Sequence, residues 1–289
     1  MRLTPTTFIA ITIIFFVVFL PFFTGLTVLC FSQKSKKTGV LLFHRISKNY
    51  PKSLSQVSVK QFEKFCKEIA LSQKKTVNFS DFSMENNDIC IVFDDGDKSI
   101  YDFAFPVLKK YNLTATIFIA SGIIANKKIT DFYNTKNMMT AENIKEMSDN
   151  GFEIASHSAV HLDLTLLDEN DLRKELLNSK KELEKLTGKS VPALSFPYGS
   201  WNEKAITIAE ECGYKKFAVY RKHKFADGKK IIPATAVYPF DNSDGIKHKI
   251  SGKIKGTVKA LSIVIPHFAK GTPVFFWHKL YNGKNIKLN

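Results

Sequence analysis

Short apolar runs recur along the chain and alternate with longer stretches in which apolar residues are spaced three or four positions apart. The run Ile89 to Phe93 is apolar throughout, which is typical of a strand buried on both faces of a parallel sheet. Runs of strand length lie near Val40, Ile89, Ala115, Glu153, Ala193, Lys216, Ile231 and Val274. The clearest helical stretches are Val59 to Leu71, Ala141 to Asp149, Glu169 to Leu186 and Glu203 to Cys212. This alternation predicts an α/β fold.

The N-terminus has a different pattern, because no charged residue occurs between Leu3 and Gln33. As a helix, Phe8 to Phe31 would extend about 36 Å, which is enough to cross a bilayer. The pattern therefore predicts a single-pass membrane anchor. A cleaved signal peptide is the alternative, although the apolar stretch is longer than the usual h-region and lacks a clear cleavage site.

The predicted division is an anchor with a short basic linker at residues 1–37, followed by one catalytic domain at 38–289. The second part has about the 250 residues of a single α/β barrel. Lysines 34, 36 and 37 follow the anchor, whereas Arg2 precedes it, so the flanking charge weakly favours a cytoplasmic domain. The polar insert Lys127 to Asn137 is a candidate lid loop.

A formal charge of +15 and a pI near 9.5 indicate an acidic partner or surface. No nucleic-acid recognition motif accompanies this charge, so we expect a membrane rather than nucleic acid. Lysines and apolar residues alternate from Ile246 to Lys270, which suits either a helix lying on anionic headgroups or an ordinary barrel helix with a solvated face. The cysteines at 30, 66, 90 and 212 have no metal-like spacing and are expected to be free thiols.

Chemically reactive side chains follow two of the predicted strands. Asp94, Asp95 and Gly96 come directly after one strand, and His157 to His161 come after another. Carboxyl ends of parallel strands gather at one edge, where catalytic residues collect. If His157 to His161 form one helical turn, both imidazoles face one ion. Separately, the first motif is compatible with a plain turn and the second with a solvated helix face. Together they predict a hydrolytic metal site.

The order of these motifs resembles that of the polysaccharide deacetylases related to the nodulation-factor chitooligosaccharide deacetylase. The resemblance runs from Gly39 to Leu280. It comprises the opening strand Val40 to His44, the motifs Phe93 to Gly96 and His157 to His161, then Ser195 to Gly199, and finally Phe276 to His278. The resemblance implies a distorted (β/α) barrel, here preceded by one N-terminal transmembrane helix.

The resemblance also implies roles for individual residues. The metal ligands would be Asp95, His157 and His161, and Asp94 would be the general base that deprotonates the attacking water. The backbone N–H of Tyr198 would stabilise the oxyanion, and His278 would be the general acid. Ser195, Pro197 and His44 are assigned to substrate binding, with a structural role as the alternative for His44. Two imidazoles and a carboxylate favour Zn²⁺, with Co²⁺ or Ni²⁺ as substitutes.

Two features depart from the family pattern. Ser195 stands where the family commonly has an arginine that supports the base, so the pKa of Asp94 loses one stabilising charge. The family's fourth motif has no convincing match, although Trp201 or the stretch Asp241 to Asp244 are candidates.

The predicted function is metal-dependent N-deacetylation of an N-acetyl amino sugar in an envelope glycan, a lipopolysaccharide or a lipid-linked precursor. The predicted location is a bacterial inner membrane, with the side of the catalytic domain left open because relatives work outside the cytoplasm. One alternative is a catalytically degenerate glycan-binding or scaffold protein on the same fold. Another is a deacylase for a different group such as formyl. The oligomeric state, the sugar and its linkage do not follow from the sequence.

Overall fold

The computed structural model describes residues 39–49, 51, 53–124, 137–219 and 230–251. The strands are β1 (Val40–Phe43), β2 (Arg45–Ser47), β3 (Gln56–Ser58), β4 (Cys90–Phe93), β5 (Thr116–Ile119), β6 (Glu153–Ser156), β7 (Ala193–Ser195), β8 (Lys216–Val219), β9 (Ile231–Pro233) and β10 (Thr235–Ala236). The helices are α3 (Val59–Leu71), α4 (Phe105–Lys110), α5 (Ala141–Asp149), α6 (Glu169–Thr187), α7 (Glu203–Glu211) and α8 (Ser243–Ser251), with a π-helical turn at Ile100–Ala104.

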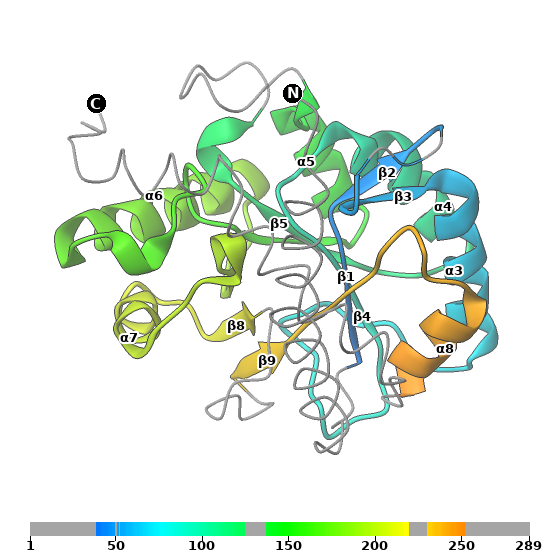
Figure 1. Cartoon of the computed structure of the whole chain (residues 1–289). Helices are drawn as coiled ribbons and strands as arrows, with labels where there is room; N and C mark the ends of the chain where they lie inside the picture. The colour runs from blue at the N-terminus through cyan, green and yellow to red at the C-terminus, as the bar shows by residue number, and fades with distance from the viewer. Residues whose placement is uncertain (1–38, 50, 52, 125–136, 220–229, 252–289) are drawn as a thin grey trace, which may run out of the picture.

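The main sheet is a nearly closed parallel barrel with helices around its outside (Figure 1). Its eight strands follow the order β10-β1-β4-β5-β6-β7-β8-β9, and β2 and β3 form a separate parallel pair. The two outermost strands of the order are neighbours in the chain. β9 pairs with β8, and β10, which begins two residues after β9 ends, pairs with β1. One extended segment, residues 231–236, therefore joins the two sides of the sheet.

The strand and helix positions expected from the sequence are confirmed within the described residues. The predicted helices at 59–71 and 141–149 have those bounds, while α6 ends at Thr187 and α7 ends at Glu211. N-terminal capping explains where these helices begin, because a side chain before each helix accepts a hydrogen bond from a backbone N–H group of the first turn. These capping residues are Ser58, Thr140, Asp168 and Asn202. Gly188, with φ of 68°, ends α6 in the left-handed conformation that suits glycine.

Alternate residues of each strand face opposite sides of the sheet. One set, which includes Leu41 and Phe93, packs with helix residues such as Phe62. The other set includes Val40, Leu42, Val92, Ala155 and Ala193, and it packs with residues of other strands and of loop 77–82 rather than with the described helices. We infer that this second set fills the barrel interior. Continued to the strand ends and just beyond them, its alternation reaches positions 44, 94, 157 and 195.

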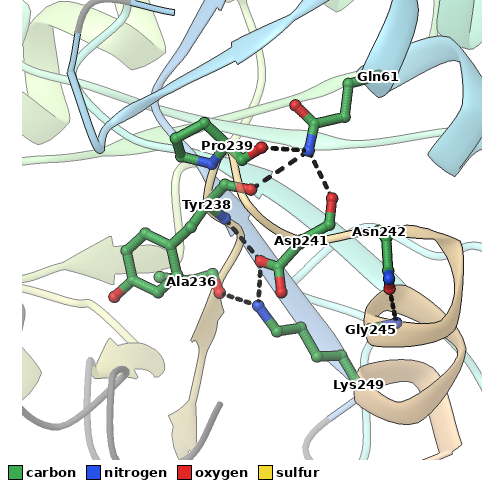
Figure 2. A network of polar contacts seen from close by, with 8 residues as sticks. All are labelled: Gln61, Ala236, Tyr238, Pro239, Asp241, Asn242, Gly245 and Lys249. Carbon is green, nitrogen blue, oxygen red and sulfur yellow. Dashed lines mark hydrogen bonds and ion pairs between the residues drawn. The ribbon is translucent and has the colours of Figure 1, made fainter. Parts of the chain in front are cut away.

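Helix α8 is attached to the barrel by a buried ion pair, shown in Figure 2. The ammonium group of Lys249, which is 0% exposed, lies 2.5 Å from Asp241 Oδ2 and donates to the Ala236 carbonyl at 2.7 Å. Asp241 Oδ2 also accepts the Tyr238 N–H, and the Gln61 amide of α3 donates to the Asp241 carbonyl at 2.6 Å. The turn after β10 is therefore held between α3 and α8.

Several sequence predictions lie outside the described residues. They are the N-terminal anchor, the strand near Val274, the motif ending at His278, the cysteine at position 30 and nearly all of the candidate lid. Across the parts of the chain that are described, no helix combines the length and the apolar character needed to cross a membrane. The three described cysteines, Cys66, Cys90 and Cys212, are buried free thiols, as predicted.

The segment predicted from Ile246 to Lys270 is described only as far as α8. Ile246 is buried there, as expected for the apolar face of an amphipathic helix. Lys249 is buried as well, because it pairs with Asp241. This lysine therefore belongs neither to a solvated face nor to a surface facing headgroups.

Candidate active site

The predicted ligands Asp95, His157 and His161 meet at the carboxyl ends of β4 and β6. Asp95 Oδ1 lies 3.3 Å from His161 Nε2 and 3.6 Å from His157 Nε2. One donor atom from each of the three residues lies within 4.8 Å of the other two. Ligands about 2.1 Å from a tetrahedral ion are about 3.4 Å apart, so the two shorter separations match two edges of such a site.

The local conformation of the histidine loop differs from the prediction. Residues 157–161 do not form a helical turn, because Ser158 and His161 have φ of 65° and 59°. The expectation of a shared helix face is therefore wrong, yet the two rings still meet, with centroids 4.9 Å apart. The left-handed residues reverse the chain after β6, and this reversal replaces helical spacing as the means of bringing the imidazoles together.

The protonation of His157 suits metal binding. Its Nδ1 lies 2.9 Å from the Ser195 carbonyl oxygen, which can only accept, so Nδ1 carries the proton and Nε2 keeps its lone pair. Desolvation, with the neighbouring His161, lowers the pKa of His157 to about 3, so the ring is neutral at pH 7. A neutral imidazole with Nε2 directed at a carboxylate is the form that ligates metals.

Asp95 is ionised although its side chain is only 16% exposed. Burial alone would raise its pKa, but the hydrogen bond and charge of His161, together with His44 and His157, hold that pKa well below its usual range. The charged oxygen therefore offers a hard ligand beside two borderline nitrogen donors. This donor set fits a divalent ion of the zinc type.

The pKa of Asp94 is shifted in the opposite direction to that of Asp95. The Asp94 carboxyl group is buried, and desolvation raises its pKa to about 7 against the opposing effect of His44. Ser195 Oγ donates to Asp94 Oδ2 at 3.2 Å. Asp94 Oδ1 is buried with no hydrogen-bond partner among the described residues. One oxygen is thus held by Ser195, while the other is available to accept a proton.

The remaining predicted residues are placed as follows. Pro197 begins a 3-10 turn, Pro197–Gly199, in which Tyr198 has φ of 59°, and the Tyr198 ring lies edge-on to His161 at 4.7 Å. His44 follows β1 at the inward position, and its charge lowers the pKa of both Asp94 and Asp95. His278 is not described, so its predicted role as general acid stays a prediction.

Sequence reasoning missed two residues next to this site. Glu175 and Ser179 of α6 form hydrogen bonds with backbone groups of the histidine loop. The glutamate and serine lie in a strongly polar helix pattern, where they resemble solvent-facing positions.

Comparisons with known proteins agree with this geometry. Residues 83–217 match the profile of the family described as polysaccharide deacetylase. A Bacillus subtilis (strain 168) protein named as a polysaccharide deacetylase, YxkH, is 31% identical over 192 residues, which are 64% of this chain and 64% of that protein. A poly-beta-1,6-N-acetyl-D-glucosamine N-deacetylase of Staphylococcus aureus (strain MSSA476) is 30% identical over 184 residues, covering 58% of this chain and 60% of the relative.

The chain thus spans less than two thirds of the length of these curated relatives. Among solved structures, that of the Streptococcus pyogenes deacetylase PplD has a TM-score of 0.65 at 21% identity, and the match covers 75% of this chain and 99% of that one. At this level of identity the similarity establishes the barrel fold.

Proposed function

We propose that the chain, of which residues 83–217 match the polysaccharide deacetylase family, hydrolyses the acetamide of an N-acetyl amino sugar and releases acetate. The observation that carries the proposal is the pair Asp94 and Asp95. One carboxylate is held ionised among imidazoles, and its neighbour is buried with a raised pKa and an available oxygen. Two carboxyl groups with opposite proton affinities are suited to ligation and base catalysis respectively.

Asp95, His157 and His161 would hold a divalent cation, with Zn²⁺ preferred and Co²⁺ or Ni²⁺ as substitutes. When bound, this ion supplies Lewis-acid polarisation of the acetamide carbonyl. Asp94 Oδ1 removes a proton from the attacking water, while Ser195 holds the other carboxylate oxygen in place. The oxygen of the water bonds to the carbonyl carbon, the C–N bond breaks, and the sugar nitrogen leaves as an amine after it gains a proton from the proposed general acid, His278.

For the substrate, we propose a polymer of N-acetylglucosamine in the bacterial envelope. The support is the Staphylococcus aureus relative, whose name specifies a β-1,6-linked polymer. A lipid-linked N-acetyl amino sugar is the second substrate hypothesis, because a membrane anchor would place the site close to lipid carriers.

The test is acetate release by the full-length chain, purified in detergent and loaded with Zn²⁺. The substrates are oligomers of β-1,6- and β-1,4-linked N-acetylglucosamine and a lipid-linked N-acetyl amino sugar. We expect Asp94→Asn to lower kcat by about 10²- to 10⁴-fold while the zinc content stays at one per chain. Asp149→Asn, which changes an exposed carboxylate of α5, is the matched control and should leave kcat unchanged.

Release of formate in place of acetate, from a panel that includes N-formyl sugars, would indicate a different acyl group. A folded, zinc-loaded protein that binds the oligomers and releases neither acid would contradict the proposal. That outcome would favour the scaffold hypothesis, which is supported by Ser195 in place of the family's arginine and by the unmatched fourth motif.

A further inference from the structure

The loop that carries both histidines adopts a conformation that its own residues do not favour. Ser158 and His161 have φ of 65° and 59°, and neither is a glycine. Such residues each cost about 1–3 kcal/mol and persist where their surroundings hold them in place. The geometry of the proposed metal site therefore depends on contacts from outside the loop.

Part of this support comes from β5 and the turn after it. The N–H groups of Ser121 and Gly122 donate to the carbonyls of Ser158 and Ala159 at 3.2 and 2.8 Å. Within the loop, Ser158 Oγ accepts the His161 N–H at 3.0 Å. These contacts hold the Ser158 and Ala159 carbonyls and the backbone N–H of His161 in place.

The remaining support comes from the buried face of α6. Glu175 Oε1 accepts the N–H of Val160, the residue before His161, at 2.7 Å. One helical turn later, Ser179 Oγ donates to the Ser158 carbonyl at 2.9 Å. Glu175 is 1% exposed and Ser179 is fully buried. A single helix thus holds the loop through an acceptor and a donor spaced four residues apart.

Burying a carboxyl group at position 175 is energetically unfavourable. Burial raises the pKa of Glu175, which reflects the unfavourable desolvation of its charge. Half of the buried residues of α6 are leucines, namely Leu172, Leu176 and Leu183. An apolar side chain at 175 would satisfy the core but leave the buried N–H of Val160 without its acceptor.

We propose that Glu175 is a positioning residue of the metal site, acting through the Val160 N–H to hold His161 at its angle toward Asp95. Ser179 assists from the Ser158 carbonyl. The proposal rests on the proposed function in that it takes Asp95, His157 and His161 as the ligands. Its test measures metal affinity and needs no turnover.

The experiment measures Zn²⁺ affinity of the full-length chain by competition with a chromophoric chelator. We expect Glu175→Ala to weaken Zn²⁺ binding by about 10- to 100-fold, the usual cost of losing a group that orients a ligand. Glu175→Gln keeps an acceptor of the same length and should recover most of the affinity. The His161→Ala variant, which removes a ligand, shows that the measured ion occupies this site.

The matched control is Glu184→Ala. Glu184 lies on the same helix, and its Oε1 accepts the Val191 N–H at 3.0 Å in the loop before β7, away from the histidines. It should lower the melting temperature without changing Zn²⁺ affinity.

Equal losses of affinity in Glu175→Ala and Glu184→Ala would overturn the proposal, since loss of stability alone would explain both. A loss in Glu175→Gln as large as that in Glu175→Ala would also overturn it, because charge rather than the hydrogen bond would then be responsible. Zinc binding that responds to Glu175 in a protein that releases no acetate would support the proposal and contradict the proposed function. Binding unaffected by His161→Ala would contradict both.

Discussion

Asp94 and Asp95 are adjacent in the chain, yet their surroundings drive their ionisation in opposite directions. Asp95 faces two imidazoles, whereas one oxygen of Asp94 is buried without a partner among the described residues. Residue types and strand ends were enough to predict a hydrolytic metal site, and the family resemblance assigned Asp95, His157 and His161 as its ligands. The difference between the carboxylates was assigned only through the family resemblance, because it depends on desolvation by residues far apart in the chain.

This difference predicts a pH-dependent effect of Asp94→Asn on the metal-free protein. The pKa of Asp94 is about 7 when folded, against about 3.9 when unfolded. Between these values the folded wild type retains a proton that the unfolded chain has lost, so its free energy of unfolding falls as pH rises. The Asp94→Asn variant has no carboxyl group at this position, so it lacks this decrease in the free energy of unfolding. Its stability relative to wild type should therefore increase from pH 4 to pH 7, by about 4 kcal/mol at most, and then level off.

Urea unfolding in a chelator at pH 5 and pH 8 measures this difference. Asp149→Asn, with an exposed carboxylate, should show no comparable change between the two pH values. A stability difference between Asp94→Asn and wild type that stays constant from pH 5 to pH 8 would show that the folded protein does not raise the pKa of Asp94.

His44 gives a second prediction for single residues. It is the histidine, among the described residues other than the two proposed ligands, that acts on both Asp94 and Asp95. If His44 protonates the leaving amine, His44→Ala should lower kcat by about 10²- to 10⁴-fold. The same effect in His278→Ala, with His44→Ala unaffected, would return this role to His278.

At the scale of elements, the helices were predictable because capping residues and apolar spacing are local. The contacts of Glu175 and Lys249 were not predictable, because a charged residue in a helical pattern usually faces solvent. In the structure each is buried against a specific partner from another part of the chain. The helical turn expected for His157 to His161 failed for a similar reason, since support from α6 and β5 overrides the local preference of Ser158 and His161.

The attachment of α8 predicts a large effect for a buried ion pair (Figure 2). Lys249→Ala leaves the Asp241 carboxylate buried without its cation, so the free energy of unfolding should fall by about 3–5 kcal/mol. Lys145→Ala removes an exposed pair with Asp149 and should cost at most about 1 kcal/mol. Chemical denaturation measures both variants. Similar small losses in the two would mean that water reaches Asp241 in solution.

At the scale of the whole molecule, the α/β barrel could be anticipated from the alternation of strand-length apolar runs with helical stretches. How the sheet closes could not be anticipated. Residues 231–236 carry a single apolar run in the sequence, and the structure divides that run between β8 and β1. No local signal specifies which two strands a segment will join.

The N-terminal anchor stays a prediction at this scale. We expect the full-length chain to sediment with membranes and to resist extraction by 1 M salt, a concentration at which electrostatic attachment is screened to about 3 Å. Detergent should release it. A chain that starts at Gly39 should be recovered without detergent. Release of the full-length chain by salt alone would indicate surface attachment through its net charge of +15.

The joining segment at residues 231–236 also has a consequence for synthesis on the ribosome. Until Ala236 leaves the exit tunnel, the nascent chain carries β1 and β8 with unpaired backbone edges, one formed early in translation and one late. Such edges readily pair with strands of other chains. Chains that terminate prematurely between Val219 and Ile231 should therefore aggregate, whereas a chain that continues only a few residues further can bury both edges in one step.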